Sequence, residues 1–573
     1  SYQGISARYV SNAVTSGSGN NAAGVVPMIT AINGNGTQIT LNTVVREYAD
    51  DDFHAASVGG VFNLFNAKYG GGNTGSASVS NLTLKGKTTD NGVALQYYDA
   101  SGNVAANASN WKYQSNVGVG SLFGSSSGAG ASSSWYTASI KFSNIVFEDM
   151  KVKGPSVAGG LMGNLGRLAS GGNTAAGNIA ILLQPYPGGN GQQTLYISST
   201  FENCSYSGLT VEGQSTAGGF CGWIDGQATP QTNLNVTDAS VVVGSSSTIS
   251  ATLSDSQVGG LYGYVRRNVG VNKNGTQPVI LKDVNVSAGR YAGGLIGQAN
   301  VDANIYAYNI NNVQVLSTDG KTQIKGTSTG EIYAGGIAGY VTSYSNRNQI
   351  VNCKIENVTI NEDNNNITSA GSANKRAGGI VGLVNAGAVK VDNCKVTSTN
   401  IYGSLSGGIA GSVNTTATIS NCELSGSTAT VKGGKCAAGI IGVIVNSNKV
   451  GIHDSQVNNV SIVSLGDWAS GGLVGDISWG SVPYLYLFDS VINGCSITGT
   501  RAGGLTGDVR GNLNGSNLLL KDTTIKATNT NQTGLLTGQT GNKDLKPMSI
   551  AGISIQNTTA SENGKNITKL YGT

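Results

Sequence analysis

The tightest group of acidic residues in the sequence is Asp50-Asp51-Asp52, with Glu47 and His54 close by. A glycosidase needs two facing carboxylates, so hydrolytic chemistry is one interpretation of this group. A solvated run of charge is the other. A second acidic pair, Glu362-Asp363, precedes three asparagines in an expected loop. Either calcium binding or a solvated turn fits that pair, although EF-hand spacing is missing.

Other catalytic and ligand-binding signatures are missing from the sequence. The only histidines are His54 and His453, so neither a zinc site with Cys-His spacing nor a serine-histidine triad is indicated. The glycine-rich segments lack the lysine of a phosphate-binding loop. We therefore predict no catalytic residue, no metal and no cofactor.

Two tryptophans are the candidate contact residues for a ligand or partner. Trp111 and Trp135 lie in or near long insertions and are flanked by Ser, Asn, Lys and Tyr. Exposed aromatic rings at such positions stack on sugars or on protein partners. Core packing or anchoring of the loop is the alternative.

Composition excludes several classes of partner. Charged residues make up 11% of the 573 residues and the net charge is +4, with Arg266-Arg267 the densest basic pair. Nucleic-acid binding needs a basic stripe, which is missing. No apolar run reaches membrane-spanning length, so no direct membrane insertion by this segment is expected. A surface built from Ser, Thr, Asn and Gln suits an extracellular β-protein.

Two motifs alternate along the chain and organise it. The first is a glycine pair followed by an aliphatic residue, a spacer and a third glycine, as in Gly335-Gly336-Ile337-Ala338-Gly339. The second is an apolar residue, a spacer, Asn or Asp, a small or apolar residue, a spacer and another apolar residue, as in Ile350-Val351-Asn352-Cys353-Lys354-Ile355. Its Asn or Asp positions are Asn81, Asn144, Asn203, Asp238, Asp283, Asn312, Asn352, Asn393, Asn421, Asp454, Asp489 and Asp522, with Gly552 as a thirteenth.

The spacing of the second motif predicts a corner at the Asn. Side chains of an unbroken strand share a face only at even offsets. A corner at Asn352 lets Ile350, Cys353 and Ile355 all point inward, and Asn tolerates the left-handed conformation that such a corner needs. Stacked asparagines could hydrogen-bond in a ladder. Ordinary turn residues are the alternative.

The glycine motif predicts another corner followed by a short strand. Paired glycines permit unusual backbone angles and close backbone approach. We expect Ile337, Gly339 and Val341 to share a face, with Gly339 leaving room for bulk from the opposite wall. Helix is not expected, because glycine disfavours it. Cys353, Cys394 and Cys422 share one motif position and should stack in the core as free thiols, rather than form a disulfide framework.

These motifs predict an all-β parallel β-helix, a solenoid of about 13 irregular coils. Residues 1–55 should form an N-terminal cap and 56–540 the repeats. Larger insertions fall within 82–120 and 161–202, and they carry either recognition or neutral loops. Residues 541–573 should form the last coil and a C-terminal cap.

The paired motifs resemble the GLUG repeat of large bacterial secreted and cell-surface proteins, over roughly residues 58–555. The resemblance implies a right-handed solenoid within an adhesin or autotransporter-like passenger. We expect a structural or adhesive extracellular protein at a bacterial cell surface. Its partners would be a host or cell-surface protein, a glycan, or copies of itself in a fibre. The alternative is a glycan-active β-helix enzyme, either polysaccharide lyase or glycosidase, or a carbohydrate-binding module.

Overall fold

The chain divides into two compact units, Ser1–Val236 (unit 1) and Thr237–Thr573 (unit 2). The computed structural model describes residues 31–48, 57–68, 75–99, 101–104, 117–129, 136–165, 195–224, 237–239, 242–243, 247–266, 269–272, 277–301, 307–369, 371–372, 374–445, 449–478, 484–528, 532–540 and 548–572. Within each unit, strands of successive coils pair in parallel. The predicted parallel β-solenoid is therefore confirmed.

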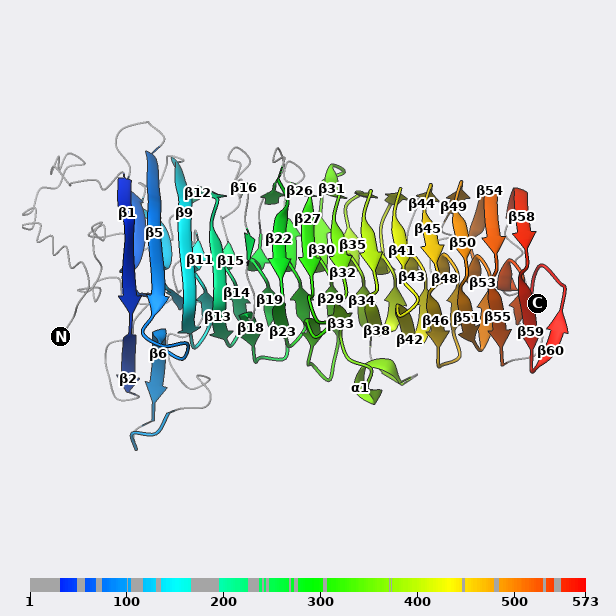
Figure 1. Ribbon diagram of the computed structural model, residues 1–573, viewed down its shortest axis with the longest axis horizontal. Coiled ribbons are helices and arrows are strands. Elements are labelled where there is room, and N and C mark those ends of the chain that lie inside the picture. The colour runs from blue at the N-terminus through cyan, green and yellow to red at the C-terminus, as the bar shows by residue number, and fades with distance from the viewer. Residues whose placement is uncertain are drawn as a thin grey trace, which may run out of the picture. The chain divides into compact units, whose positions relative to one another are not determined.

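Each coil of unit 2 passes through three sheets in turn (Figure 1). One coil runs through β26 (Tyr308–Asn311) and β27 (Val313–Leu316) in sheet C, β28 (Gln323–Gly326) and β29 (Ile332–Gly335) in sheet A, and β30 (Ala338–Ser343) in sheet B. The next coil repeats this order with β31 (Asn348–Val351), β32 (Lys354–Glu356), β33 (Thr359–Ile360), β34 (Lys375–Gly378) and β35 (Val381–Ala386).

The other strands of sheet C in unit 2 are β17 (Val242–Val243), β21 (Val269–Val271), β22 (Val279–Lys282), β36 (Val389–Asp392), β37 (Lys395–Thr397), β40 (Ala417–Ser420), β41 (Glu423–Ser425), β44 (Lys449–His453), β45 (Gln456–Asn458), β49 (Tyr484–Phe488), β50 (Val491–Asn493), β54 (Asn512–Lys521) and β58 (Met548–Gln556). The other strands of sheet A in unit 2 are β16 (Thr237–Ala239), β18 (Ser247–Ala251), β19 (Gln257–Gly259), β23 (Val284–Ala288), β24 (Tyr291–Gly293), β38 (Asn400–Gly407), β42 (Thr430–Ala438), β46 (Ser461–Ser464), β47 (Ala469–Gly471), β51 (Ser496–Gly499), β52 (Arg501–Gly503), β55 (Thr524–Ala527), β56 (Thr533–Gly534), β59 (Thr559–Glu562) and β60 (Lys565–Ile567). Asp238 of the predicted corner series lies within β16.

Sheet B has four strands in unit 1 and nine in unit 2, which together match the thirteen predicted coils. Those not yet given are β4 (Phe62–Lys68), β8 (Phe123–Ala129), β11 (Met162–Leu165), β15 (Cys221–Ile224), β20 (Tyr262–Val265), β25 (Ile296–Val301), β39 (Ala410–Val413), β43 (Ile441–Val445), β48 (Val474–Ser478), β53 (Thr506–Val509) and β57 (Thr537–Thr540).

The strands of sheet A in unit 1 begin earlier than the motifs predict. Residues 31–48, which fall in the predicted cap, form β1 (Ala31–Leu41) and β2 (Thr43–Tyr48), parallel to β5 (Gly75–Gly86) and β6 (Gly92–Tyr98). A register shift between Asn33 and Thr37 interrupts the corner motif there, which hid strand β1 from the sequence pattern. The remaining strands are β3 (Ser57–Gly59), β7 (Gly118–Gly120), β9 (Tyr136–Lys153), β10 (Val157–Gly159), β12 (Leu195–Glu202), β13 (Ser205–Gly213) and β14 (Thr216–Gly218).

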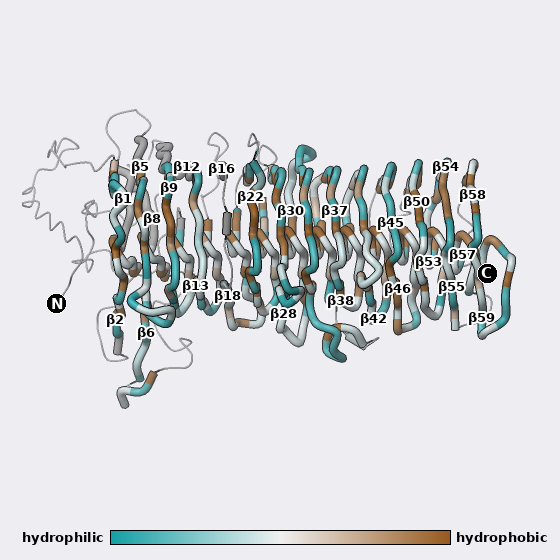
Figure 2. Tube along the Cα trace, in the orientation of Figure 1, coloured by the Kyte–Doolittle hydropathy of each residue, from teal (hydrophilic) through white to brown (hydrophobic). Residues whose placement is uncertain are grey.

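The cores of the two units use different side chains. In unit 1 the buried rings of Phe142 and Phe201 stack with centroids 4.9 Å apart, and Phe147 contacts Phe220 at 5.4 Å. In unit 2 aliphatic residues fill the coils, and Figure 2 shows apolar positions recurring along successive coils. Burying such side chains is the main favourable term for each coil.

The Asn corner has the predicted geometry. Asn352 has φ +56°, and the side chains of Ile350, Cys353 and Ile355 are all buried. In unit 2 this first corner is occupied by Asn312, Asn352, Asn393, Asn421, Asp454, Asp489, Asn517 and Gly552, in register from coil to coil. Gly552 (φ +63°) thus stands in for Asn as predicted.

Besides Asp238, which lies within β16, two of the predicted corner residues do not lie at the first corner. Asp283 and Asp522 lie at a second corner, five residues beyond the first, which the sequence analysis missed. Positive φ recurs at this second corner as well. Its residues in unit 2 include Asp283, Asn357, Ser398, Gly426, Asn459, Gly494, Asp522 and Asn557.

The glycine corner depends on space rather than on unusual backbone angles. Gly335, Gly336 and Gly339 all lack a positive φ. A Cβ on Gly336 would lie 2.1 Å from the carbonyl oxygen of Gly379 in the next coil. A Cβ on Gly339 would lie 2.6 Å from the carbonyl oxygen of Tyr333. Backbone, not a bulky side chain as predicted, therefore fills the space beside Gly339.

One helix departs from the expectation that helix is absent. Helix α1 (Asn365–Thr368) lies in the insertion between β33 and β34. The Asn364 side chain accepts a hydrogen bond from the Ile367 amide, which is an N-cap. Buried Lys375 donates to Asn366 Oδ1 and to the Ser328 carbonyl, both at 2.9 Å, and so ties the insertion to the coil.

Candidate functional site

Asparagine side chains at the first corner form hydrogen-bonded ladders. In unit 2, Asn393 Nδ2 donates to Asn352 Oδ1, and Asn352 Nδ2 donates to Asn311 Oδ1, each at 2.8 Å. In unit 1 the same contact joins Asn203 to Asn144 at 2.8 Å and Asn144 to Asn81 at 2.9 Å. The predicted ladder is confirmed. We call the aligned first-corner residues of unit 2 the corner row.

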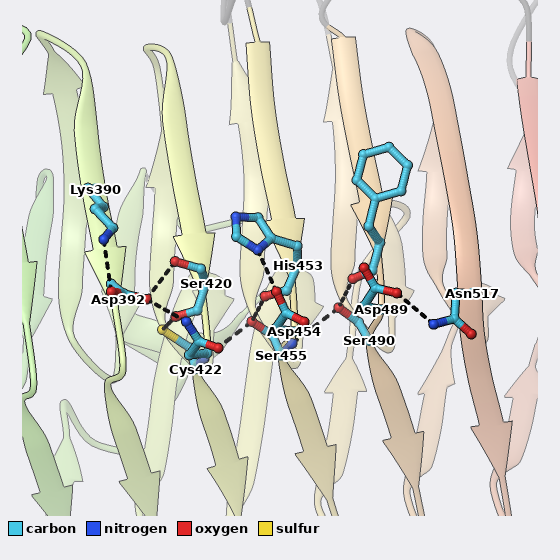
Figure 3. Close-up of polar contacts among 12 residues, drawn as sticks. Lys390, Asp392, Ser420, Cys422, His453, Asp454, Ser455, Asp489, Ser490 and Asn517 are labelled. Carbon is cyan, nitrogen blue, oxygen red and sulfur yellow. Dashed lines mark hydrogen bonds and ion pairs between the residues drawn. The ribbon is translucent and has the colours of Figure 1, made fainter.

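Further along unit 2, aspartates lie at the first corner (Asp454 and Asp489) or directly before it (Asp392, which precedes Asn393) (Figure 3). Asp392 accepts from Lys390 Nζ at 2.9 Å, Ser420 Oγ at 2.7 Å and Asn421 Nδ2 at 2.8 Å. Burial favours the protonated form of Asp392, but these three donors outweigh it and lower the pKa to about 2. Asp489 likewise accepts from Asn517 Nδ2 at 2.6 Å. The carboxylates therefore act as acceptors within the wall.

His453 does not form a catalytic triad with its neighbours. Its Nδ1 lies 2.8 Å from Asp454 Oδ2, which resembles the orienting half of a triad. The Ser455 hydroxyl, however, donates to the His453 backbone carbonyl at 2.9 Å rather than approaching the imidazole. The pair is a surface contact of the corner row (Figure 3).

The cysteines lie where the motif predicts. All seven are free and buried, and Cys353, Cys394 and Cys422 occupy matching positions in three successive coils. Burial raises the pKa of Cys394, which holds it as the thiol. Ser455 and Ser490 continue the row in the next two coils. The Cys422 amide donates to Ser455 Oγ at 3.3 Å. This row packs the core and lacks the exposure of a reactive thiol.

A second polar feature of unit 2 was not predicted. Beside the glycine corner, one row of side chains from sheet A meets a row from sheet B, and we call this contact the seam. The sheet A row is Tyr291, Tyr333, Arg376, Leu405, Cys436, Ala469 and Arg501. The sheet B row is Tyr340, Leu383, Ser412, Val443, Asp476 and Asp508.

The first part of the seam is aromatic and basic. Tyr340 contacts the rings of Tyr291 and Tyr333 at centroid distances of 5.5 Å and 5.4 Å. The Arg290 and Arg376 guanidinium groups lie over the Tyr333 ring at 5.5 Å and 5.3 Å. Burial raises the pKa of Tyr291 to about 12, so these phenols stay neutral. The rings pack against each other rather than facing a ligand.

The middle of the seam is apolar. Leu405, Cys436 and Val443 form a buried cluster, and Trp468 packs against it. Lys435 Nζ lies 5.6 Å from the Trp468 ring centroid. This tryptophan therefore anchors a loop, which is the alternative that was considered for Trp111 and Trp135.

The last part of the seam holds two buried carboxylates in adjacent coils. Asp508 Oδ2 accepts from Arg501 Nη1 at 2.8 Å and from Arg510 Nη2 at 3.0 Å. Asp476 lies beside Asp508 in register, and burial together with the Asp508 charge raises the pKa of Asp476 to about 7. Two neighbouring carboxylates, one of them with a raised pKa, resemble the pair formed by a general acid and a nucleophile. The Asp476 and Asp508 residues are only 1% and 0% exposed, so a polymeric substrate does not reach them.

Several candidate residues lie outside the described part of the chain. These are Trp111, Trp135, His54 and the run Asp50-Asp51-Asp52. The predicted acidic pair is described: Glu362 forms an ion pair with Lys325, and Asp363 Oδ1 lies 2.7 Å from Lys432 Nζ. The two carboxylates for which calcium binding was considered are thus paired with lysines of sheet A. Within the described ranges, His, Cys, Asp and Glu side chains nowhere gather in threes as a metal site would require. The one described helix is too short to span a membrane.

Comparison with known proteins gives no relative: no family model matches the chain, and neither a curated protein nor a solved structure is significantly similar to it. The fold, the corner row and the seam define a parallel β-solenoid.

Proposed function

We propose that this chain is an extracellular structural or adhesive protein of a bacterial cell surface. Its stacked coils would form a rigid scaffold that presents loops or assembles into surface fibres. Partners would be a host or cell-surface protein, a glycan, or copies of the same chain. The resemblance of the repeat to the GLUG repeat supports the surface location, as does the low charge of the sequence.

The corner row is the observation that carries this proposal. Several asparagines of the corner row donate a side-chain hydrogen bond to the preceding coil, as Asn352, Asn393 and Asn421 do, so these side chains hold the wall together instead of converging on a ligand. Such stacked repeats extend a protein in one dimension and suit a scaffold. The acid pair Asp476–Asp508 would favour the enzymatic alternative if it were open to solvent, but both groups are buried.

Immunogold electron microscopy of whole cells tests the proposal. Antibodies against the purified chain should label the cell surface, and label confined to the cell interior would contradict it. A polysaccharide depolymerisation screen addresses the alternative. Turnover that disappears in Asp508→Asn would exclude a purely structural role.

A further inference from the structure

Two of the three sheets are closed at the C-terminal end of unit 2. In sheet A, β59 pairs with β60 in an antiparallel hairpin, with Ala560 opposite Ile567. In sheet B, the Leu570 carbonyl accepts from the amides of Leu536 at 2.9 Å and Thr537 at 3.2 Å. The chain therefore continues past these two sheets and covers their edges, as a C-terminal cap should.

Sheet C is not closed in this way. Its last strand, β58, pairs with β54, and no other described strand lies along its second edge. Ile553 and Ile555 of β58 are only half-buried, whereas Leu518 and Leu520, their counterparts in β54, are 2% and 0% exposed. Part of the core is thus uncovered at this edge. The predicted C-terminal cap is complete for sheets A and B only.

Backbone groups at this edge are directed toward a further strand. In earlier coils, the carbonyl at the position of Ile553 accepts from an amide of the next coil. The Cys394 carbonyl accepts from the Glu423 amide at 2.9 Å, and the Cys422 carbonyl accepts from Gln456 at 2.8 Å. The Ile553 carbonyl occupies the same place in β58.

Strand β1 of unit 1 has the complementary free edge. It pairs with β5 on one side, and no described strand lies on the other. Ile32 and Ile39 are half-buried, while Val79 and Leu84 opposite them are 1% and 0% exposed. In β1, apolar residues lie on both sides of the corner at Asn35 (φ +49°), as they do around Gly552 in β58.

We propose that β58 binds β1 of a second copy of this chain as a parallel strand. Ile550 would lie opposite Ile32 and Ile555 opposite Ile39, with the two extra residues of β1 between Asn33 and Thr37 bulging at the corner as they do against β5. This pairing continues the core and the corner from one copy to the next. Because the two surfaces differ, each added copy leaves a new β58 exposed, and the contact builds an open filament. This inference rests on the proposed structural function and names the joint that such a fibre would use.

Cysteine cross-linking tests both the joint and its register. Ser554 of β58 and Gln38 of β1 are exposed and would lie opposite each other. The seven native cysteines are buried, so they should not compete. A mixture of Ser554→Cys and Gln38→Cys chains should give a disulfide-linked dimer under mild oxidation, whereas either variant alone should not. No dimer in the mixture, or an equal yield from Ser554→Cys alone, would overturn the proposal.

A charge at the joint provides an independent test. Ile555→Lys places a lysine toward the half-open core, where its stem can snorkel to solvent, and Ser554→Lys places it on the exposed face as a matched control. By analytical ultracentrifugation, the unmodified chain and Ser554→Lys should self-associate with rising concentration, and Ile555→Lys should stay monomeric with an unchanged circular dichroism spectrum. Self-association of Ile555→Lys equal to that of Ser554→Lys would overturn the joint. The immunogold experiment tests the surface location independently of the joint. The proposed function and the proposed joint can therefore fail separately.

Discussion

The corner row and the seam run along the same coils of unit 2 but follow opposite rules. The corner row repeats Asn or Asp, lies at the surface, and several of its side chains bond to the preceding coil, as Asn393 does to Asn352. The seam changes from Tyr and Arg, through Leu and Val, to Asp and Arg, and most of it is buried. The residues of the corner row repeat because each one has to fit the same backbone corner. The residues of the seam vary because each pair has to pack between two particular strands.

This difference predicts how each region responds to substitution. A corner residue has to supply a positive φ and one hydrogen bond, which two or three residue types can do. A residue beside the seam or the glycine corner has to fit one fixed space. The glycine corner and the seam should therefore tolerate far less change than the corner row.

The largest effect should come from the glycine corner. Gly336→Val would place a Cβ 2.1 Å from the Gly379 carbonyl oxygen, which is backbone and cannot move aside. We expect a loss of more than about 4 kcal/mol or a failure to fold. Gly451→Val is the control, since a Cβ there meets nothing within 4 Å. Urea unfolding followed by circular dichroism measures both, and equal midpoints would refute this account of the corner.

The acidic part of the seam should come next. Asp508→Ala leaves Arg501 and Arg510 without their carboxylate partner. Breaking a buried pair is strongly destabilising, and because both arginines are partly exposed we expect about 2 to 3 kcal/mol. Asp319→Ala, which removes an exposed ion pair with Lys321, should leave stability nearly unchanged. Chemical unfolding decides this, and similar losses in both variants would contradict a special role for the seam.

Stability should also depend on pH through Asp476. Its pKa is raised to about 7 in the folded protein, from about 3.9 in an unfolded chain. The folded state therefore binds the extra proton, so this contribution to stability is fully present below about pH 4 and is lost as pH rises through 7. The urea midpoint should fall between about pH 4 and pH 7 and level off above pH 7, and Asp476→Asn should flatten that fall. Asp392, with a lowered pKa, titrates below this window. An unchanged slope in Asp476→Asn would refute the assignment.

The smallest effect should be at the corner row. Asn393→Gly keeps the φ of +50° accessible and loses only the side-chain bonds of the ladder, so we expect a loss of about 0.5 to 1 kcal/mol. Asn393→Ala adds the strain of a left-handed alanine, about 1 kcal/mol more. Thermal unfolding of the two variants separates the loss of the ladder hydrogen bond from the strain of the backbone. Equal melting temperatures would show that the positive φ is not what selects Asn here.

Much of the coil could be predicted from sequence because it depends on local offsets. The inward positions of Ile350, Cys353 and Ile355 follow from one break in alternation at Asn352, and the structure confirms them. The second corner was not predicted because its residue type varies, from Asn357 to Ser398 to Gly426. Its distance of five residues from the first corner is nevertheless constant.

The seam could not be predicted because it depends on contacts across a corner. Arg501 and Asp508 lie on two different strands, and whether they meet depends on how closely the glycines let those strands approach. Neither residue belongs to a repeated pattern. The open edge of sheet C could not be predicted either, because half-buried Ile555 has the same sequence pattern as buried Leu520.

The most direct test of the central claim is electron microscopy of the material isolated from the native cell surface. If the chain is a stacked structural element, averaged images should show filaments with an axial repeat of about 4.8 Å, the spacing between parallel strands. That repeat should run through the joints between copies without interruption. Isolated, unassociated particles at native concentration, or filaments without this repeat, would contradict the account.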